Sequence, residues 1–202
     1  MKRGWYKGAE YSYFLTNTLV GWKPVFVSDP YAKIILDAFR FFRTEKLVNL
    51  LAFVIMPTHL HYIVNLTNSK LTLSDFQRDF KKWISRQVEQ MLLNEERDGQ
   101  NLLDEVFLHS GLIRQESPSS LINFFRSEGR AVGQGFKLWR VDEKPEAISS
   151  RDFLRQKIEY LHSNPLKAGF VQRASDYPYS SARNYELDDQ SLIEIYTDLI
   201  VS

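Results

Sequence analysis

The pattern of apolar and polar residues predicts a strand and then a helix in the first part of the chain. Residues 11–20 alternate between the two kinds and are rich in aromatic and β-branched side chains, as is typical of a strand. After Pro30 the apolar side chains recur three and four positions apart, which indicates a helix over residues 29–46.

Two apolar runs follow and predict two more strands. Residues 47–56 are almost continuously apolar, and residues 59–66 continue the run after a break at Pro57 and Thr58. We therefore expect a buried strand that is followed at once by a second one.

A long amphipathic helix is predicted over residues 72–96, with Ser74 as its N-terminal cap. One side of this helix carries a basic stripe whose members are spaced four positions apart, namely Arg78, Lys82 and Arg86. The apolar side is formed by Phe76, Phe80, Trp83, Ile84 and Val88.

Short strands and one more helix are expected in the second half. Residues 136–141 and 146–149 have the composition of short strands. Residues 149–164 repeat apolar side chains at helical spacing. Pro165 ends this helix, because proline has no N–H and disfavours the helical conformation in the residue before it.

This order of elements is typical of an α+β sandwich of the ferredoxin-like kind, in which an antiparallel sheet carries helices on one face. Residues 94–135 are polar and weakly periodic, so we interpret them as a variable helical insertion and not as a separate domain. Residues 171–202 are rich in turn residues and form a C-terminal extension. We expect a single domain over residues 1–202.

Composition narrows the classes of protein and site that fit the chain. Of its 202 residues 44% are hydrophobic and 25% are charged, as in an ordinary globular protein. There is no cysteine, which excludes disulfides and thiolate metal sites. The formal net charge is +1, so a nucleic-acid-binding surface would have to be a local patch.

Neither a membrane span nor a secretory signal is predicted. No apolar run approaches the roughly 18 residues of a membrane-spanning helix. The N-terminal residues are charged and lack the apolar centre of a signal peptide. We therefore expect a cytoplasmic protein.

Two of the four histidines, His59 and His61, lie in one predicted strand. Alternate residues of a strand point to the same face, so the two imidazoles project together while Leu60 points into the core. Neutral imidazole is a common metal ligand, and such a pair can hold one divalent cation. Taken alone, the spacing favours two polar residues on a solvent-exposed face, because an isolated His-x-His is not a specific motif.

Tyr160 and Asn164 are four positions apart in the last predicted helix and therefore share a face. Tyr160 is a candidate nucleophile and Asn164 a candidate third metal ligand. Each residue also has a purely structural interpretation. Tyr160 fits a packed aromatic side chain with a satisfied hydroxyl, and Asn164 fits a residue at a helix end before a proline.

Three segments, MPTHLHYIV, YLHSNPLKAGFV and YPYSSARNY, occur in this order along the chain. Together they resemble the REP-associated tyrosine transposases, a single-tyrosine branch of the HUH (His–hydrophobic–His) superfamily. The resemblance covers most of the chain and is weakest over residues 94–135.

The resemblance implies a metal-dependent nuclease and strand transferase that acts on single-stranded DNA near hairpins. His59, His61 and Asn164 would bind Mg²⁺ or Mn²⁺ beside the scissile phosphate. Tyr160 would attack the phosphorus and leave a 5′-phosphotyrosine and a free 3′-OH, which can later be rejoined. Relatives act as monomers or as homodimers, and no membrane partner is implied.

Contacts to DNA are expected from the basic side chains of the long helix, Arg78, Lys81, Lys82 and Arg86. Lys167 is a further candidate because it is close to Tyr160 in the sequence. A solvated helix face with acidic neighbours explains the basic stripe equally well.

The segment VDEKPEAI departs from the family pattern, because relatives often have histidine before this proline and Lys144 stands here instead. This change leaves open a domesticated protein that binds hairpin DNA and cuts it weakly or not at all. A third interpretation is an unrelated metal-dependent hydrolase that uses the histidine pair.

Overall fold

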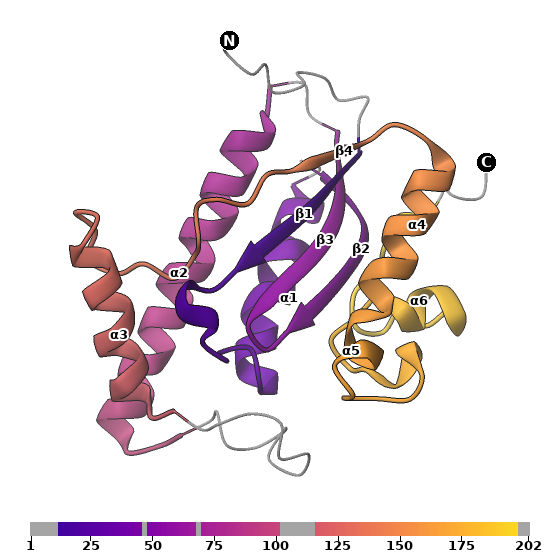
Figure 1. Ribbon diagram of the computed structural model, residues 1–202. Coiled ribbons are helices and arrows are strands. Elements are labelled where there is room, and N and C mark those ends of the chain that lie inside the picture. Colours follow the sequence, from indigo (N-terminus) through magenta and orange to yellow (C-terminus); the bar gives the residue numbers. More distant parts are fainter. Residues whose placement is uncertain (1–11, 46–47, 68–69, 102–115, 198–202) are drawn as a thin grey trace.

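The computed structural model describes residues 12–45, 48–67, 70–101 and 116–197, and Figure 1 traces the chain through them. The strands are β1 (Ser12–Thr18), β2 (Val48–Met56), β3 (His59–Leu66) and β4 (Glu146–Ile148). The helices are α1 (Asp29–Thr44), α2 (Leu73–Asp98), α3 (Pro118–Arg130), α4 (Arg151–His162), α5 (Asn164–Lys167) and α6 (Ala182–Glu186). Two 3-10 turns complete the set, η1 (Val20–Trp22) and η4 (Ala174–Asp176).

The four strands form one sheet in the order β2-β3-β1-β4, and every neighbouring pair is antiparallel. This order confirms the predicted α+β sandwich. The strand predicted over residues 136–141 is wrong, because this segment makes only an isolated bridge between Leu19 and Trp139. Trp139 instead donates its indole N–H to the carbonyl oxygen of Lys81 at 3.0 Å, which ties the segment to α2.

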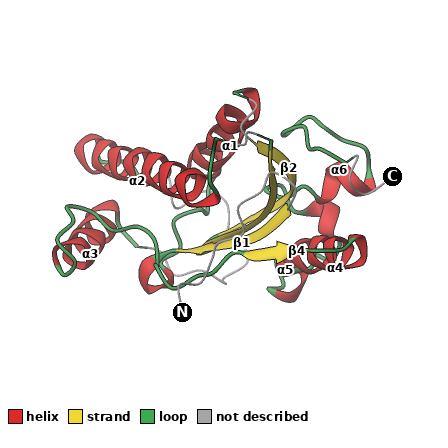
Figure 2. Cartoon of the chain, turned by 90° about the horizontal axis from the view of Figure 1, so that it is seen from above, coloured by secondary structure: helices red, strands yellow, loops and turns green. Residues whose placement is uncertain are grey.

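Helices cover both faces of the sheet, so the prediction of helices on one face is wrong (Figure 2). Tyr62 of β3 packs its ring against Phe39 of α1 and Phe80 of α2, each 5.4 Å away between centroids. His61, the preceding residue, faces Tyr160 of α4 on the opposite side. The reason is visible in β2, whose side chains apart from Asn49 are apolar on both faces and so require cover on each.

The face covered by α1 and α2 holds an aromatic core. Phe80 contacts the rings of Phe39 and Phe76 at 5.0 and 5.5 Å, and Phe42 contacts Phe76 at 5.0 Å. These side chains are buried, as are Ile84 and Val88 further along α2. They fix the two helices to the sheet behind the histidine strand.

The long helix α2 is confirmed, with two corrections in detail. Its N-terminal cap is Thr72 and not Ser74, because the Thr72 hydroxyl accepts the backbone N–H of Asp75 at 3.1 Å. Trp83 was expected on the apolar side but is 38% exposed. Within the described ranges, no helix combines the length and the apolar character that a membrane crossing needs.

The expected helical insertion contains α3, which packs on α2. Residues 102–115, also part of this insertion, lie outside the described residues. Helix α4 begins behind Ser150, whose hydroxyl accepts the N–H of Phe153 at 3.2 Å. It ends at His162, and Pro165 then lies in the first turn of the short helix α5.

The C-terminal segment runs along the free edge of β2. The backbone N–H of Ile55 donates to Tyr179 at 2.8 Å, and the N–H of Ser181 donates to Phe53 at 2.9 Å. Further along, the N–H of Tyr196 donates to Leu50 at 2.8 Å. Backbone groups of an edge strand that would otherwise be unpaired are therefore satisfied within the chain.

His162 joins this segment to the sheet and should make stability depend on pH. Its ring Nε2 is 2.8 Å from the Ser181 hydroxyl, and burial lowers the pKa of His162 from 6.5 to about 4. Between pH 6.5 and about pH 4, His162 is therefore protonated in the unfolded chain but neutral in the folded chain. The contribution of His162 should be complete above pH 6.5 and should fall by about 3 kcal/mol as the pH drops to about 4.

This dependence can be measured by urea unfolding of the wild type and His162→Gln across that pH range. The difference in unfolding free energy between the two proteins isolates His162 from the other histidines. We expect the wild type to lose its advantage as the pH falls. A difference that stays constant with pH would contradict the buried neutral state of His162.

Candidate active site

Strand β3 places His59 and His61 on the face of the sheet that α4 covers. Their ring centroids are 4.9 Å apart, and Leu60 between them is fully buried on the other face. His61 is only 6% exposed, and His59 is partly exposed. The predicted shared face is therefore observed, whereas a purely solvent-exposed pair does not describe His61.

Two threonine hydroxyls hold the imidazoles in place. Thr16 lies opposite His61 in the register of β1 and β3, and its Oγ1 is 2.8 Å from His61 Nδ1. Thr58, in the turn before β3, places its Oγ1 2.9 Å from His59 Nδ1. In the tautomer with the proton on Nδ1, each ring donates to its threonine and presents the Nε2 lone pair. This arrangement matches the way in which metal-binding histidines are oriented by their second nitrogen.

The surroundings keep both imidazoles neutral. Burial lowers the pKa of His59 to about 4. Burial also lowers the pKa of His61 to about 3, with further contributions from the nearby His59 and Lys157. A protonated imidazole cannot bind a metal, so this neutral state is the one that coordination requires.

Tyr160 of α4 lies against His61. The two ring centroids are 5.5 Å apart, and the Tyr160 ring also contacts Phe14 of β1 at 5.9 Å. Helix α4 is seated on the sheet by its buried residues Leu154 and Ile158. Tyr160 itself remains 43% exposed, so its phenol is accessible next to the histidine pair.

Two lysines flank the Tyr160 ring. The Nζ of Lys157 is 5.9 Å from the ring centroid, and the Nζ of Lys167 is 5.1 Å from it. Lys157 also pairs with Glu146 at 2.6 Å. Lys167 was a sequence candidate, but Lys157 was not. Its position three residues before Tyr160 on the same helix face is the signal that could have found it.

Asn164 caps the end of α4. Its Nδ2 donates to the carbonyl oxygens of Tyr160 at 2.8 Å and Leu161 at 3.2 Å. The second of these bonds replaces one that Pro165 cannot make, because proline has no N–H. The structure thus supports the helix-end interpretation of Asn164 directly. Its Oδ1 is the atom left for the predicted role as a metal ligand.

The donor atoms allow a test of whether a divalent cation fits here. Among the described residues, no group of three or more His, Cys, Asp or Glu side chains could hold a metal ion. In the tautomer described above, His59 and His61 each present Nε2 as a possible ligand. The candidate donors are therefore the two imidazoles, with the Asn164 Oδ1 as the third donor that the sequence predicts.

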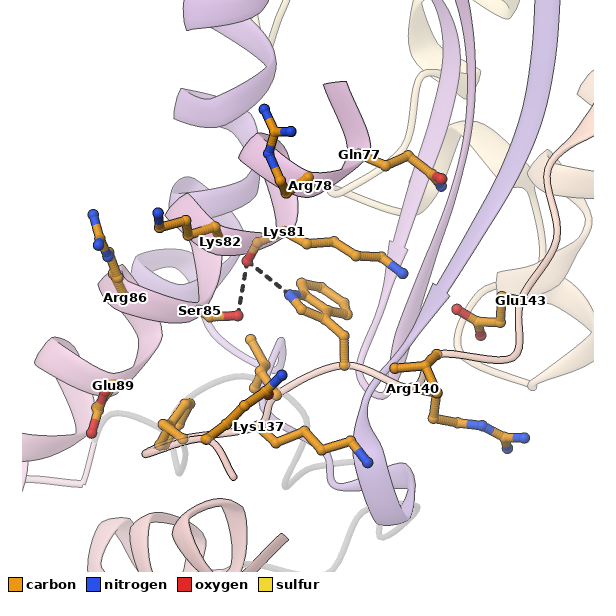
Figure 3. A pocket seen from close by; sticks show the side chains of 15 residues that line it. Gln77, Arg78, Lys81, Lys82, Ser85, Arg86, Glu89, Lys137, Arg140 and Glu143 are labelled. Carbon is orange, nitrogen blue, oxygen red and sulfur yellow. Dashed lines mark hydrogen bonds between the residues drawn. The ribbon is translucent and has the colours of Figure 1, made fainter. Parts of the chain in front are cut away.

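A groove of about 600 Å³ lies between α2 and the segment that follows α3 (Figure 3). The side of α2 contributes Arg78, Lys81, Lys82, Ser85 and Arg86, and the opposite wall contributes Lys137, Leu138, Trp139 and Arg140. The predicted basic stripe therefore forms one wall of a cavity and meets further cations that sequence reasoning missed. Glu89 and Glu143 are the acidic members of the lining.

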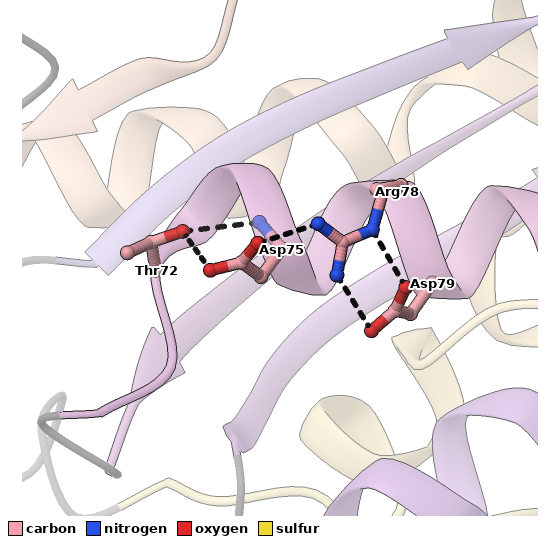
Figure 4. A network of polar contacts seen from close by, with 4 residues as sticks. All are labelled: Thr72, Asp75, Arg78 and Asp79. Carbon is pink, nitrogen blue, oxygen red and sulfur yellow. Dashed lines mark hydrogen bonds and ion pairs between the residues drawn. The ribbon is translucent and has the colours of Figure 1, made fainter.

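The cations of this groove are not equally available to a ligand. Arg78 pairs with Asp75 at 2.7 Å and with Asp79 at 2.9 Å, and Figure 4 shows its guanidinium held between the two carboxylates. Burial lowers the pKa of Lys81, and the negative charges of Glu143 and Asp142 partly offset this lowering. Lys82 and Arg86 are exposed on α2.

The segment that contains Lys144 runs beside β1 near His59. Glu143 accepts the backbone N–H of Thr18 at 2.9 Å, and Thr18 lies opposite His59 in the sheet. Lys144 itself is exposed. The departure from the family pattern is therefore close to the candidate active site, although the Lys144 side chain is directed to solvent.

Comparison with known proteins identifies the fold. No protein-family model matches the sequence, and no curated protein matches it. Among solved structures, a REP-associated tyrosine transposase bound to a REP hairpin superimposes with a TM-score of 0.59 at 16% sequence identity. The match covers 100% of this chain and 94% of that one. The chain has the fold of a REP-associated tyrosine transposase.

A second solved structure, from Deinococcus radiodurans R1 and provisionally named a transposase, matches with a TM-score of 0.41 at 20% identity. It covers 80% of this chain and 98% of its own. The fold assignment rests on the first of these structures. This fold agrees with the resemblance found in the sequence.

Proposed function

We propose that this protein is a transposase-type endonuclease that cleaves and rejoins single-stranded DNA near hairpins through a tyrosine. The observation that carries the proposal is the position of Tyr160, whose exposed ring lies 5.5 Å from His61 and between two lysines. This arrangement supports the proposal because it brings a candidate nucleophile, two imidazoles and a lysine ammonium together on one face of the sheet. The solved structure with this fold is bound to a REP hairpin, which supports a hairpin as the ligand.

The proposed reaction exchanges one phosphodiester for another. The Tyr160 oxygen loses its proton and bonds to the phosphorus, while the bond from phosphorus to the 3′ oxygen breaks. The departing oxygen takes up a proton and becomes a free 3′-OH, and the 5′ phosphate stays on Tyr160. The reverse attack by another 3′-OH rejoins the strand. The two phosphodiesters are similar in energy, so no further reactant is needed.

The side chains around Tyr160 have separate roles in this proposal. His59, His61 and the Oδ1 of Asn164 would hold Mg²⁺ or Mn²⁺, which supplies Lewis-acid polarisation of a phosphate oxygen when bound. Thr16 fixes the orientation of the His61 ring. Lys167 places positive charge beside the Tyr160 ring, where the phosphate would lie, whereas Glu146 already balances the charge of Lys157 at 2.6 Å.

Lys144 and the helix-end contacts of Asn164 favour one alternative, a protein that binds hairpin DNA but cleaves it weakly or not at all. The alternative shares the fold and the groove with the first proposal. It differs only in the chemistry of Tyr160, so one experiment separates the two.

The experiment uses hairpin oligonucleotides with randomised single-stranded flanks, incubated with the protein and Mg²⁺ or Mn²⁺. Covalent products are isolated on a denaturing gel, digested with protease and mapped by mass spectrometry. We expect a nucleotide attached to Tyr160, and no product when the metal is chelated. Tight binding without any covalent product would establish the alternative. A product on another of the ten tyrosines would refute the role of Tyr160.

The groove predicts an uneven effect of removing its cations on DNA affinity. Arg86→Gln should weaken binding of a single-stranded oligonucleotide several-fold and lower the slope of log affinity against log salt by about 1. Arg78→Gln should change both less, because Asp75 and Asp79 already balance its charge. The measurement is a salt titration of the two variants and the wild type. Equal losses for both variants would contradict this ranking.

A further inference from the structure

Trp22 is a large apolar side chain left exposed between the candidate active site and the groove. It is 54% exposed, and its ring centroid is 5.8 Å from that of His59. The guanidinium of Arg140, which lines the groove, lies 5.7 Å from the indole centroid. The indole therefore contacts both the candidate active site and the groove.

The backbone holds Trp22 in this place in a conformation that side chains rarely adopt. Its φ is +54°, in the left-handed region, where a non-glycine residue persists only if its surroundings impose it. The N–H of Trp22 donates to Leu19 at 3.1 Å, and the neighbouring N–H of Val20 donates to Leu138 at 2.9 Å. Both bonds fix the turn η1 to the sheet and to the groove wall.

Gly21 adds a second constraint on the same turn. A Cβ at Gly21 would lie 2.5 Å from Phe124 of α3, so the ring packs directly on the glycine backbone. Lys23, on the other side of the turn, places its Nζ 4.6 Å from the same ring. The turn is thus clamped, and the indole is presented at a defined position.

The other described tryptophans show that this exposure is particular to Trp22. Trp139 is buried and its indole N–H is bonded to Lys81. Trp83 is partly exposed on α2 but is not among the groove residues. Only Trp22, of these three, combines an exposed ring with contacts to a candidate metal ligand and a groove cation.

We propose that Trp22 and Arg140 form a binding subsite for one unpaired nucleobase of a single DNA strand. The placement next to the attacked phosphate rests on the proposed function. A base can stack on the exposed indole surface, and such stacking tolerates any sequence because every base has a flat π-face. Asp142 pairs with Arg140 at 2.5 Å and reduces its net charge, so stacking and not charge carries the contact.

The subsite selects unpaired strands for a physical reason. In a duplex both faces of a base are already stacked on its neighbours, and separating them costs a few kcal/mol. A single strand offers a free face without this cost. Trp22 therefore discriminates against paired DNA at the position beside His59.

The test compares two probes of equal length and charge, an oligodeoxythymidine of about twelve nucleotides and the same backbone without bases. The wild type should bind the first about tenfold more tightly than the second at constant salt. Trp22→Ala should bring this ratio close to one, and Trp22→Phe should retain most of it. Trp83→Ala is the matched control and should keep the wild-type ratio.

Every outcome of this comparison decides the proposal. A ratio near one in the wild type, or a wild-type ratio in Trp22→Ala, would overturn the subsite. If Trp22→Ala does not fold, Trp22→Phe still reports, because the share of the fluorescence quenching that comes from Trp22 should be lost while affinity remains, and quenching as strong as in the wild type would overturn the subsite. A Tyr160 adduct together with a ratio near one would remove the subsite and leave the proposed function. A tenfold ratio without any adduct would keep the subsite and remove the proposed function.

Discussion

Tyr160→Phe should reduce the covalent protein–DNA product at least about a thousandfold. The change removes only the phenol oxygen, which is the proposed nucleophile. The ring contacts of Tyr160 with Phe14 and His61 are made by carbon atoms and remain in the variant. The nearby lysine ammonium groups also keep an aromatic ring beside them. Hairpin binding should therefore stay within about twofold of the wild type.

Tyr185→Phe is the matched control for this prediction. The Tyr185 hydroxyl donates to the Leu51 carbonyl at 2.7 Å, and this bond takes no part in the proposed reaction. Its loss should cost about 1 kcal/mol of stability and leave covalent product formation unchanged. A Tyr160→Phe variant that still forms the product on denaturing gels would disprove the assigned nucleophile.

Phe80→Ala should lower the free energy of unfolding by about 3–5 kcal/mol. The Phe80 ring is fully buried and contacts aromatic rings from α1, β3 and its own helix at 5.0 to 6.1 Å. A cavity in its place would loosen α2 from the sheet directly behind the histidine strand. Domains are stable by only about 5–15 kcal/mol, so this loss is large.

Urea unfolding followed by circular dichroism measures this effect. Phe41→Ala provides the comparison, because Phe41 lies on α1 but is 57% exposed. Its truncation should change the unfolding free energy by about 0.5 kcal/mol or less. Similar losses for the two variants would mean that the aromatic core is not where the structure places it.

Most elements could be predicted because their patterns are local. Alternation located β1, and helical spacing located α1, α2 and α4. The extended segment around Trp139 was taken for a strand because its composition is that of one. What attaches it is a bridge to Leu19, an indole bond to α2 and the N–H of Lys137 donated to Phe125 of α3, and none of these contacts can be read from composition.

The candidate site could be predicted only in part. The shared face of His59 and His61 follows from the period of a strand, and Lys157 could have been found from its helical spacing. Thr16, by contrast, meets His61 through the register of two strands 45 residues apart. Trp22 meets Arg140 through a clamped turn. Such contacts depend on the whole fold, and no local pattern encodes them.

The cover on the edge of β2 has a consequence for synthesis on the ribosome. Phe53 is paired with Ser181, a residue 128 positions later, so this edge has no partner while most of the chain is being translated. At typical elongation rates the interval is on the order of ten seconds. During that time an apolar strand edge is open to other nascent chains, and pairing within the chain must compete with aggregation. We expect the yield of native protein to depend on chaperones that act during translation.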